Sequence, residues 1–258
     1  MINHPTFGAL LAEGKTKQIY VHPSESTLAY MVNKDQITAG DGARRNELTG
    51  KSRWSTITMA NVYCLLNAAG IDTHFIEQID DVTVLIKRCT MLPVEQVQRR
   101  IATGSYLKRT PGAREGDRFE PVLVETFLKD DANHDPQIWE SDIIARRLAT
   151  KAEIDWMAEE GRHVFETLER AWAALDVMLV DLKIEFGRDV NDKLLVADVI
   201  DNDSWRIWPG GDKNRMLDKQ IYRNLKEVTE QDLQALGDRY ALVASLTGKM
   251  LFQFQSGS

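Results

Sequence analysis

Three charged residues alternate along one short apolar stretch of the chain. Residues 179–187 read LVDLKIEFG, which places Asp181, Lys183 and Glu185 at every second position. Because the side chains of a β-strand point alternately to its two faces, a strand here carries acid, base and acid on one face and apolar side chains on the other. An ordinary half-buried strand presents a mixed polar face to solvent. The pattern therefore marks this face as a candidate site for charged chemistry.

A second acidic stretch follows at residues 194–203, after a turn at Asn191 and Asp192, which are residue types common in hairpins. A loop of two or four residues would place Glu185 opposite Asp198 and make them near neighbours on paired strands. Two opposed carboxylates repel by ~1 kcal/mol in water and by ~4 kcal/mol at a semi-buried site. A divalent cation between them reverses the sign, and hard oxygen ligands suit magnesium. The alternative is a solvated hairpin, and an odd-length loop would remove the predicted opposition.

Two glycine-containing stretches early in the chain are candidates for phosphate contact. Residues 13–17 read EGKTK, but a P-loop would need glycine in place of Ala9 and a helix where the sequence predicts a strand. A tight glycine turn can still place Lys15 and Lys17 over a polyphosphate, and an exposed turn is the alternative. Residues 38–45 read TAGDGARR, whose glycines allow a ligand to approach the backbone closely; an ordinary loop is the alternative.

Three further clusters are rich in side chains that bind anions or cations. Residues 99–105 include Arg99 and Ser105, which predict either an anion site or a favourable end to a helix dipole. Residues 129–135 read KDDANHD, which is either a second cation site or a solvated turn, without the spacing of an EF-hand. Residues 201–206 combine acceptors for ribose hydroxyls with an arginine that can grip phosphate. Together these groups favour phosphoryl transfer to an acidic acceptor.

Length and composition restrict the class of protein. The chain has 258 residues, enough for one large domain or two packed lobes. Its net charge of −7 argues against a general nucleic-acid or membrane-surface binder, and no apolar run approaches the ~20 residues of a membrane span. Cys64 and Cys89 lack metal-type spacing, so we expect reduced thiols and a cytoplasmic protein. Residues 1–5 lack the pattern of a signal peptide.

Hydrophobic periodicity and turn residues predict the elements that position these groups. Besides the two acidic stretches, the expected strands are residues 15–21, 28–33, 75–79, 82–89 and 122–129. The expected helices are residues 51–69, 93–102, a long amphipathic helix opened by a capping box at Thr150 and Glu153, and residues 229–254. We expect a hinge between two lobes at residues 91–93 and a loop at residues 106–121. This mixture predicts an α+β fold.

The longest of these motifs resemble one enzyme family. Residues 91–105, MLPVEQVQRRIATGS, and residues 179–187 are similar to two signatures of the phosphoribosylaminoimidazole-succinocarboxamide synthase, or SAICAR synthetase, family. Shorter motifs of the family resemble residues 13–17, 38–44 and 129–135. The resemblance implies a two-lobed, ATP-grasp-like α+β fold with antiparallel sheets and flanking helices. It implies a nucleotide-covering lobe at residues 1–91 and a lobe at residues 92–258 with the metal and phosphoribosyl-substrate site, the two forming one catalytic unit.

The same resemblance implies an activity and its cofactors. The family joins L-aspartate to 5-amino-1-(5-phosphoribosyl)imidazole-4-carboxylate at the expense of ATP, giving SAICAR, ADP and phosphate in de novo purine biosynthesis, with an acyl phosphate as the expected intermediate. We therefore expect a carbon–nitrogen ligase that uses ATP and Mg²⁺ and binds small-molecule substrates. We expect no nucleic-acid or membrane partner, and a homo-oligomer is left open.

Roles for individual residues follow from the resemblance. The implied catalytic residues are Lys183, Asp181 and Arg206. The implied nucleotide-binding residues are Lys15, Lys17, Lys87, Met91, Glu95, Glu185 and Asp198, with the backbone of residues 87–92 at adenine and Glu95 at the ribose. The implied magnesium ligands are Glu185, Asp198 and Asp135. The implied substrate-binding residues are Arg99, Ser105, Lys129, Asp181, Asp203, Arg206, Lys219 and Arg223.

Two other functions are compatible with a nucleotide cleft. A kinase-like phosphotransferase acting on an alcohol would release ADP without making an amide. A non-catalytic nucleotide sensor would bind ATP and would keep its function after Glu185→Gln. The presence of Lys15, Glu185 and Asp198 argues against the sensor.

Overall fold

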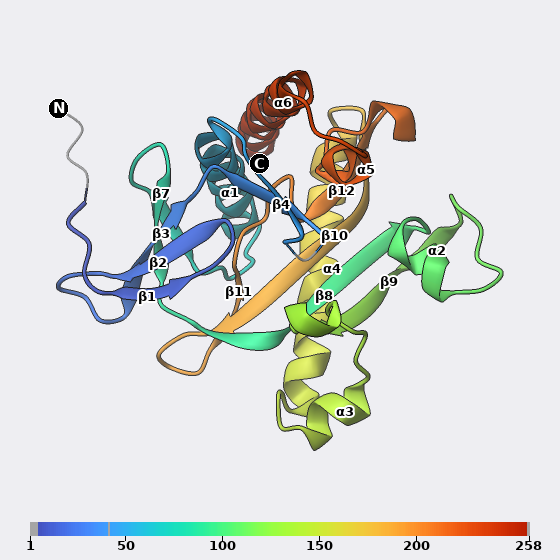
Figure 1. Cartoon of the computed structure of the whole chain (residues 1–258). Coiled ribbons are helices and arrows are strands. Elements are labelled where there is room, and N and C mark those ends of the chain that lie inside the picture. Colours follow the sequence, from blue (N-terminus) through green and yellow to red (C-terminus); the bar gives the residue numbers. More distant parts are fainter. Residues whose placement is uncertain (1–4, 41, 257–258) are drawn as a thin grey trace.

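Two antiparallel sheets flanked by helices form the molecule, which makes the fold α+β as predicted (Figure 1). The computed structural model describes residues 5–40 and 42–256. Within these residues the first sheet has the strand order β1-β2-β3-β7-β6. Its strands are β1 (Leu10–Glu13), β2 (Lys17–Val21), β3 (Leu28–Asn33), β6 (Phe75–Gln78) and β7 (Thr83–Lys87).

The second sheet is built around one long strand, β10 (Val177–Arg188). The other strands of this sheet are β8 (Thr90–Ile101), β9 (Arg118–Leu128), β11 (Leu194–Ala197) and β12 (Trp205–Pro209). One side of β10 pairs with β8, and the other side pairs first with β12 and then with β11. The chain between β11 and β12 therefore leaves the sheet beside the middle of β10, which opens space for a site there.

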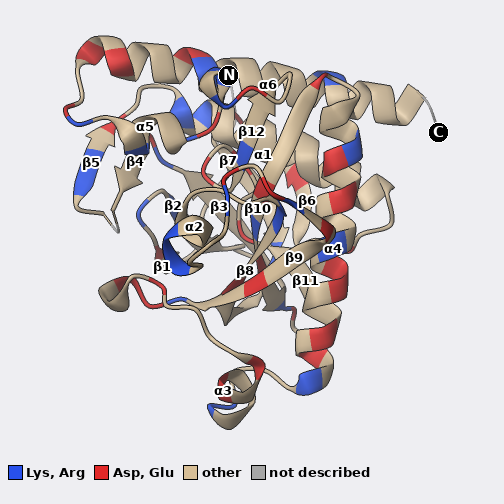
Figure 2. Ribbon diagram, turned by 90° about the vertical axis from the view of Figure 1, so that its right-hand side faces the viewer, with Lys and Arg blue, Asp and Glu red and all other residues tan. Residues whose placement is uncertain are grey.

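Helices cover these sheets and close the core. They are α1 (Lys51–Ala68), α2 (Ser105–Arg109), α3 (Glu140–Ala145), α4 (Lys151–Ala173), α5 (Gln220–Asn224) and α6 (Glu230–Ser256), with short 3-10 turns η1 (Asp131–Asn133) and η2 (Lys213–Arg215). A separate hairpin consists of β4 (Gln36–Ala39) and β5 (Arg44–Glu47). Helix α4 packs on β10, and α6 packs on α1. In Figure 2 the charged residues of α4 lie along its outer side, as amphipathicity requires.

Local sequence signals predict several of these elements correctly. Helix α1 ends within a residue of the predicted position, and Gly70 follows it with a left-handed φ of +84°. Helix α4 begins at the predicted capping box, in which the Thr150 side chain accepts from the backbone of Glu153 and the Glu153 side chain accepts from the backbone of Thr150. The hairpin of β6 and β7, strand β3 and the closing helix α6 are also confirmed.

The helix predicted at residues 93–102 is wrong, because this segment belongs to strand β8. Its inward side chains, such as Val94, Gln96 and Gln98, recur with period two, but two of these three are polar. Buried glutamines hide a strand pattern from an argument that counts apolar residues. The expected hinge at residues 91–93 likewise lies inside β8, and the loop expected at 106–121 contains α2 and the start of β9.

The predicted opposition of Glu185 and Asp198 is also wrong. The turn between β10 and β11 comprises the five residues 189–193, an odd number. Asp189 shapes this turn, because its side chain accepts hydrogen bonds from the backbone N–H groups of residues 191 and 193. Glu185 therefore pairs with Ala197, and Asp198 lies one residue beyond the end of β11.

The two sheets are joined by a parallel bridge between Thr73 and Val196. The backbone N–H of His74 donates to the carbonyl of Val196 over 2.9 Å, and the His74 side chain is only 2% exposed. The main hydrophobic core extends across this junction and includes side chains of both sheets, α1 and α4. The two sheets therefore share one core and position their charged groups relative to each other.

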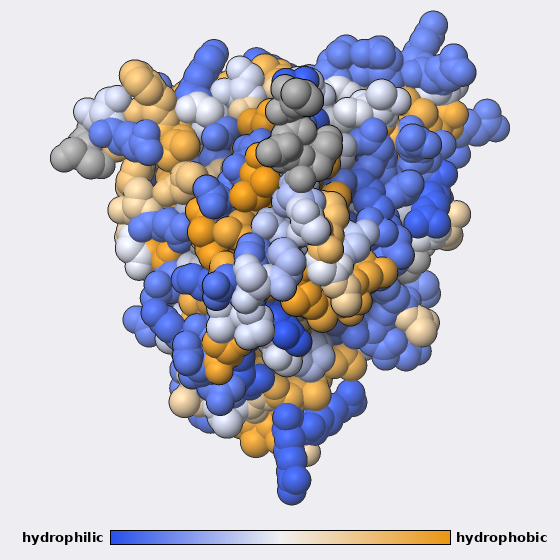
Figure 3. Space-filling view, turned by 90° about the vertical axis from the view of Figure 1, so that its left-hand side faces the viewer, coloured by the Kyte–Doolittle hydropathy of each residue, from blue (hydrophilic) through white to orange (hydrophobic). Residues whose placement is uncertain are grey.

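Apolar surface on the face that carries the first sheet forms a broken band among hydrophilic side chains (Figure 3). Leu10 and Leu11 of the edge strand β1 and Ile76 of β6 are among the partly exposed apolar residues. None of the helices in the described ranges is long and apolar enough to cross a bilayer.

The lack of a side chain at Gly161 allows α4 to pack closely against β8. A Cβ atom at this position would lie 2.3 Å from Nε2 of Gln98 and 3.1 Å from Oε1 of Gln96. Both glutamines are buried, so the clash cannot be relieved into solvent. We expect Gly161→Ala to lower the free energy of unfolding by about 1–3 kcal/mol in urea titrations.

Gly237→Ala in α6 is the matched control, because its Cβ would lie 3.7 Å from the nearest atom, Cδ1 of Leu48. Both changes gain the helix propensity of alanine, which is about 1 kcal/mol. Only the control should therefore be neutral or stabilising. Equal stability of the two variants would contradict the close packing.

We expect the protein to lose stability as the pH falls from 6.5 to 4, because the buried His74 side chain resists protonation in the folded state. Burial lowers the pKa of His74 from 6.5 to about 4. The unfolded chain takes up this proton below pH 6.5 and the folded chain only below about pH 4, so the stabilisation is complete above pH 6.5 and is lost as the pH falls through this window. We expect the free energy of unfolding to fall by about 3 kcal/mol more in the natural chain than in His74→Gln between pH 7 and pH 4. Parallel pH profiles of the two proteins would contradict this prediction.

Candidate active site

The charged face of β10 is buried at the centre of the second sheet. Asp181 and Glu185 are 3% and 4% exposed. Lys183 lies between them in the sequence, and its ammonium group pairs with Glu185. The residue opposite Glu185 on β8 is Glu95, whose Oε2 lies 3.3 Å from Nζ of Lys183. Two carboxylates thus oppose each other across paired strands, but the partner comes from β8 and not from β11.

Asp198 reaches the same space through a break in strand geometry. In a regular strand its side chain would point away from the face that Glu185 shares with the paired Ala197. Asp198 instead has a left-handed φ of +64°, a conformation that aspartate tolerates better than most residues. Asp198 and Glu185 line one cavity, although they are not cross-strand partners. The two residues therefore share a cavity, but the predicted cross-strand pairing is wrong.

Lysines from other elements neutralise these carboxylates. Lys17, the first residue of β2, pairs with Asp198, and Lys129, which follows β9, pairs with Glu185. Burial opposes the ionisation of Asp198, but the nearby ammonium groups of Lys17, Lys183 and Lys129 hold the pKa of its carboxyl well below the usual range. Burial opposes the charge of Lys183 too, but Glu185, Glu95 and Asp198 raise the pKa of its ammonium. The centre is therefore a fixed array of charges.

Glu95 differs from Asp198 in the direction of its pKa shift. Burial raises the pKa of Glu95, and the neighbouring Glu185 raises it further against the opposing effect of Lys183. Glu95 lines the charged cavities and is absent from the lining of the apolar cavity described below. Glu95 therefore lies beside the charged centre, and the expected contact with the ribose stays a prediction.

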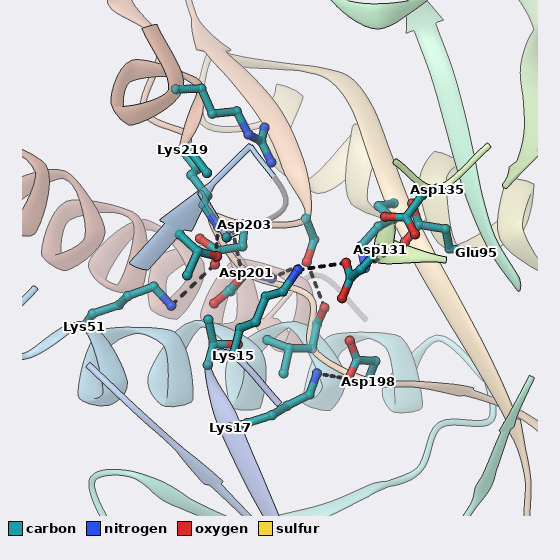
Figure 4. A pocket seen from close by; sticks show the side chains of 18 of the residues that line it. Lys15, Lys17, Lys51, Glu95, Asp131, Asp135, Asp198, Asp201, Asp203 and Lys219 are labelled. Atoms are coloured by element: carbon teal, nitrogen blue, oxygen red, sulfur yellow. Dashed lines mark hydrogen bonds and ion pairs between the residues drawn. The ribbon is translucent and has the colours of Figure 1, made fainter. Parts of the chain in front are cut away.

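The glycine turn at residues 13–17 joins two paired strands and does not open a helix, so it is not a P-loop. It joins β1 to β2, and the N–H of Gly14 donates to the carbonyl of Lys17 over 2.9 Å. Nζ of Lys15 reaches across to Oδ1 of Asp131 at 2.7 Å, while Lys17 points to Asp198 (Figure 4). The two lysines therefore project from the first sheet toward groups of the second part of the chain.

Four cavities follow one another along this charged centre. An apolar cavity of about 440 Å³ has side chains such as Met31 and Met91 in its lining. It shares Lys17 and Asp198 with a first charged cavity of about 690 Å³. The first charged cavity shares Lys183 with a second charged cavity of about 340 Å³. These cavities adjoin one another through shared walls, and we call the series the cleft.

The cleft continues into a basic cavity of about 670 Å³, which shares Gly40 and Arg223 with the second charged cavity. Ser105, Arg206 and Lys213 also line it. Gly104 leaves room for Arg206, because a Cβ there would lie 2.7 Å from its Nη2 atom. The cleft thus runs from an apolar end to an end lined by cationic side chains.

Asp181 anchors the arginines near this basic end. Its Oδ2 accepts from Nη1 of Arg99 over 2.9 Å and also pairs with Arg206. Arg99 is 2% exposed and also pairs with Glu125, so it supports the site from beneath and does not line the cleft cavities described above. Asp181 therefore orients Arg206, whereas Arg99 is held in the interior.

Asp203 is held by a second group of charges, which lines the second charged cavity. Its Oδ2 accepts from Nζ of Lys219 over 3.0 Å and lies 3.5 Å from Nζ of Lys51, and its Oδ1 accepts from the hydroxyl of Tyr240. Burial opposes ionisation, but Lys219 and Lys51 lower the pKa of Asp203 well below its usual range. Arg223 lies at the junction with the basic cavity. Asp203 is therefore an anion held between the cationic side chains of Lys51 and Lys219.

Lys51 is the residue of this group that the sequence argument missed. It is the first residue of α1 and is 2% exposed. A cation at the start of a helix opposes the helix dipole, which is a signal that a sequence argument can use. Asp201, also buried here, has a pKa raised by burial and by Asp203.

Of three further predicted residues, Lys87 lies outside the cleft, whereas Asp135 and Lys129 line it. Lys87 donates to the carbonyl of Thr73 over 3.2 Å and is not part of the lining of the four cavities. Asp135 lines both charged cavities and accepts from the backbone N–H of Asp130 over 2.7 Å. Lys129 lines the apolar and first charged cavities. The roles of these residues stay predictions.

Metal coordination would have to combine protein and substrate oxygens. In the part of the chain that the structure describes, no group of three or more His, Cys, Asp or Glu side chains is arranged to hold a metal ion. Glu185, which is buried, and Asp198, whose side chain is 16% exposed, supply two carboxylates that line one cavity. Magnesium commonly binds one or two carboxylates together with phosphates and water, so this pair fits a phosphate-bound ion better than a preformed protein cage.

Comparison with known proteins gives one consistent family. The sequence model of SAICAR synthetase matches residues 10–238. The phosphoribosylaminoimidazole-succinocarboxamide synthase of Herpetosiphon aurantiacus is 57% identical over 241 residues, which cover 93% of this chain and 98% of that protein.

Solved structures of the same family share the fold. The phosphoribosylaminoimidazole-succinocarboxamide synthase of Ehrlichia chaffeensis has a TM-score of 0.83 at 28% identity and matches 93% of this chain and 98% of its own. A SAICAR synthetase solved in complex with ADP has a TM-score of 0.80 at 31% identity, over 90% of this chain and 97% of its own. On the family match, the sequence identity and the shared fold, this chain belongs to the SAICAR synthetase family.

Proposed function

We propose that this chain ligates L-aspartate to 5-amino-1-(5-phosphoribosyl)imidazole-4-carboxylate with hydrolysis of ATP to ADP and phosphate. One observation carries the proposal: the apolar cavity, the charged centre and the basic cavity form one cleft with shared walls. Such a cleft suits a base, a polyphosphate and a second phosphorylated substrate placed in series. Family membership supports the proposed reaction.

The nucleotide is proposed to occupy the apolar and first charged cavities. The base lies against Met31 and Met91 and near the backbone of residues 87–92, while Lys15 and Lys17 approach the phosphates. A relative that was solved in complex with ADP supports nucleotide binding by this chain.

Magnesium is proposed to bind to Glu185 and Asp198 together with phosphate oxygens. The ammonium groups of Lys17, Lys129 and Lys183, which pair with the two carboxylates, indicate that the site favours positive charge. A bound magnesium ion would neutralise charge on the transferred phosphate. Asp135, whose carboxylate faces the same cavity, remains a proposed additional ligand.

The phosphoribosyl substrate is proposed to extend from the second charged cavity into the basic cavity. Ser105 and Arg206 face its phosphate, and Asp203, Lys219 and Arg223 line the route between the two cavities. Arginine binds phosphate through two parallel hydrogen bonds, and the bond that Arg206 donates to Asp181 fixes the direction of this guanidinium. The substrate carboxylate then lies near Lys183 and Lys129.

The reaction is proposed to proceed in two steps. An oxygen of the substrate carboxylate attacks the terminal phosphorus of ATP, which gives an acyl phosphate and ADP. The neutral amine of L-aspartate then attacks the acyl carbon, and phosphate leaves as the amide forms and the amine proton passes to solvent. The raised pKa of Lys183 keeps it protonated, so its role is to stabilise developing negative charge and not to act as a base.

The predicted division of labour along the chain fits the same scheme. Residues 1–91 contribute the glycine turn over the phosphates, and residues 92–258 contribute the metal and phosphoribosyl groups, in the manner of an ATP-grasp enzyme. We place the protein in the cytoplasm, in keeping with its two free cysteines, Cys64 and Cys89.

Product analysis with all three substrates tests the proposed reaction directly. We expect ADP and an amide product in equal amounts, and neither product at a comparable rate without L-aspartate. ADP release with an alcohol acceptor and no amide would instead identify a phosphotransferase. ATP binding without turnover would identify a sensor.

Glu185→Gln is expected to lower kcat/KM by about 10²–10³-fold, because it removes a charge that binds the metal–phosphate group. The change keeps the size of a side chain that is 4% exposed but removes the anion paired with Lys129 and Lys183, so thermal unfolding should show a folded protein of lower stability. Glu120→Gln is the matched control, since the side chain of Glu120 is 70% exposed and lies outside the cleft. Equal activity of both variants would contradict the proposed metal site.

Arg206→Lys is expected to raise KM for the phosphoribosyl substrate by about 10–100-fold and to leave KM for ATP unchanged, because lysine cannot form the two-pronged contact with phosphate. The effect should disappear when the substrate lacks its phosphate. Arg118→Lys, at a side chain 55% exposed, serves as the control. A parallel rise in both KM values would indicate general damage to the site and would contradict this assignment.

A further inference from the structure

A buried hydroxyl lies directly beneath the break in strand geometry at Asp198. Tyr63, in the middle of α1, is fully buried, and its Oη lies 3.0 Å from the carbonyl oxygen of Ala197 and 2.9 Å from that of Asp198. These are the last residue of β11 and the first residue beyond it. One tyrosine hydroxyl therefore contacts the two successive carbonyls at which the strand ends.

The orientation of the Asp198 carboxylate depends on the backbone at this point. Asp198 has a φ of +64°, which removes the side-chain alternation of β11 and directs its carboxylate to the cavity shared with Glu185. The chain then runs outside the sheet until the carbonyl of Ser204 accepts from the N–H of Lys183 over 2.7 Å. Tyr63 contacts the first residue of this segment, Asp198.

The Tyr63 ring is itself held in place by aromatic neighbours. It stacks on Phe75 with ring centroids 5.9 Å apart and an interplanar angle of 14°, and it lies 5.3 Å from the ring of His74. Its helix packs against the first sheet and α6. The hydroxyl thus has a defined position, set by the core and independent of the cleft.

We propose that Tyr63 is a positioning residue that orients Asp198 and thereby sets the affinity of the site for magnesium bound to a nucleotide. This inference rests on the proposed role of Asp198 as a metal ligand. Tyr63 lines none of the four cleft cavities, so it acts through the backbone of Asp198 and not by contact with a ligand.

Tyr63→Phe removes the hydroxyl and keeps the ring stacked on Phe75. Calorimetric titration of the folded chain with ADP at a series of Mg²⁺ concentrations measures the coupling without any turnover. We expect the Mg²⁺ concentration for half-maximal ADP affinity to rise about three- to tenfold, the worth of one neutral hydrogen bond. ADP affinity without Mg²⁺ should change by less than twofold.

Two comparisons separate positioning from general support of the fold. In Asp198→Asn, which retains a residue tolerant of left-handed backbone, adding Tyr63→Phe should change the Mg²⁺ dependence no further. Tyr222→Phe is the matched control, because Tyr222 is also fully buried and its hydroxyl donates to Oδ1 of Asn46 over 2.7 Å. Its Mg²⁺ dependence should equal that of the natural chain.

A Mg²⁺ dependence in Tyr63→Phe within twofold of the natural chain would overturn the inference, provided that Asp198→Asn does change it. An effect of Tyr63→Phe that persists in the Asp198→Asn background would also overturn it. If Asp198→Asn itself leaves the Mg²⁺ dependence unchanged, the proposed metal site fails and the inference fails with it.

Discussion

A charge buried in a protein must be neutralised by a partner, and this constraint organises the centre of the molecule. The middle strand β10 buries Asp181 and Glu185 on one face, with Lys183 between them. Partners for these groups come from β8, β12 and the segment after β9, and Lys17 of β2 joins them through Asp198. Elements far apart in sequence thus converge on one strand, which fixes the cleft at the junction of the two sheets.

The same network divides the site into two parts with different tasks. Glu185, Asp198 and the lysines around them form the part proposed for the nucleotide, while Asp181 orients Arg206 in the part proposed for the phosphoribosyl substrate. Lys183 belongs to the strand that serves both. Because the lysines already compensate the carboxylates, incoming phosphates and magnesium would exchange partners within an existing array, and new charge need not be buried.

Sequence patterns predict the elements whose signals are local. The capping box of α4, the glycine after α1 and the strict alternation of β10 each depend on a few neighbouring residues, and all three are present. The sequence predicts a helix where the structure has strand β8, because the polar side chains of Gln96 and Gln98 occupy inward positions. The partner of Glu185 depends on the length of a turn, and a turn of five residues pairs it with Ala197 and not with Asp198. Tyr63 reaches the site only through tertiary packing, which no local pattern encodes. Lys51 has one local signal, which is a cation at the start of a helix.

The central claim is that one charged strand holds both reactants, with Lys183 between them. A crystal structure of the chain with ADP, Mg²⁺ and the imidazole carboxylate tests it most directly. The account predicts a magnesium ion ~2.1 Å from oxygens of Glu185 and Asp198, the substrate phosphate at Ser105 and Arg206, and the ammonium of Lys183 between phosphate and carboxylate. A metal ion bound away from both Glu185 and Asp198, or a substrate phosphate outside the basic cavity, would contradict it.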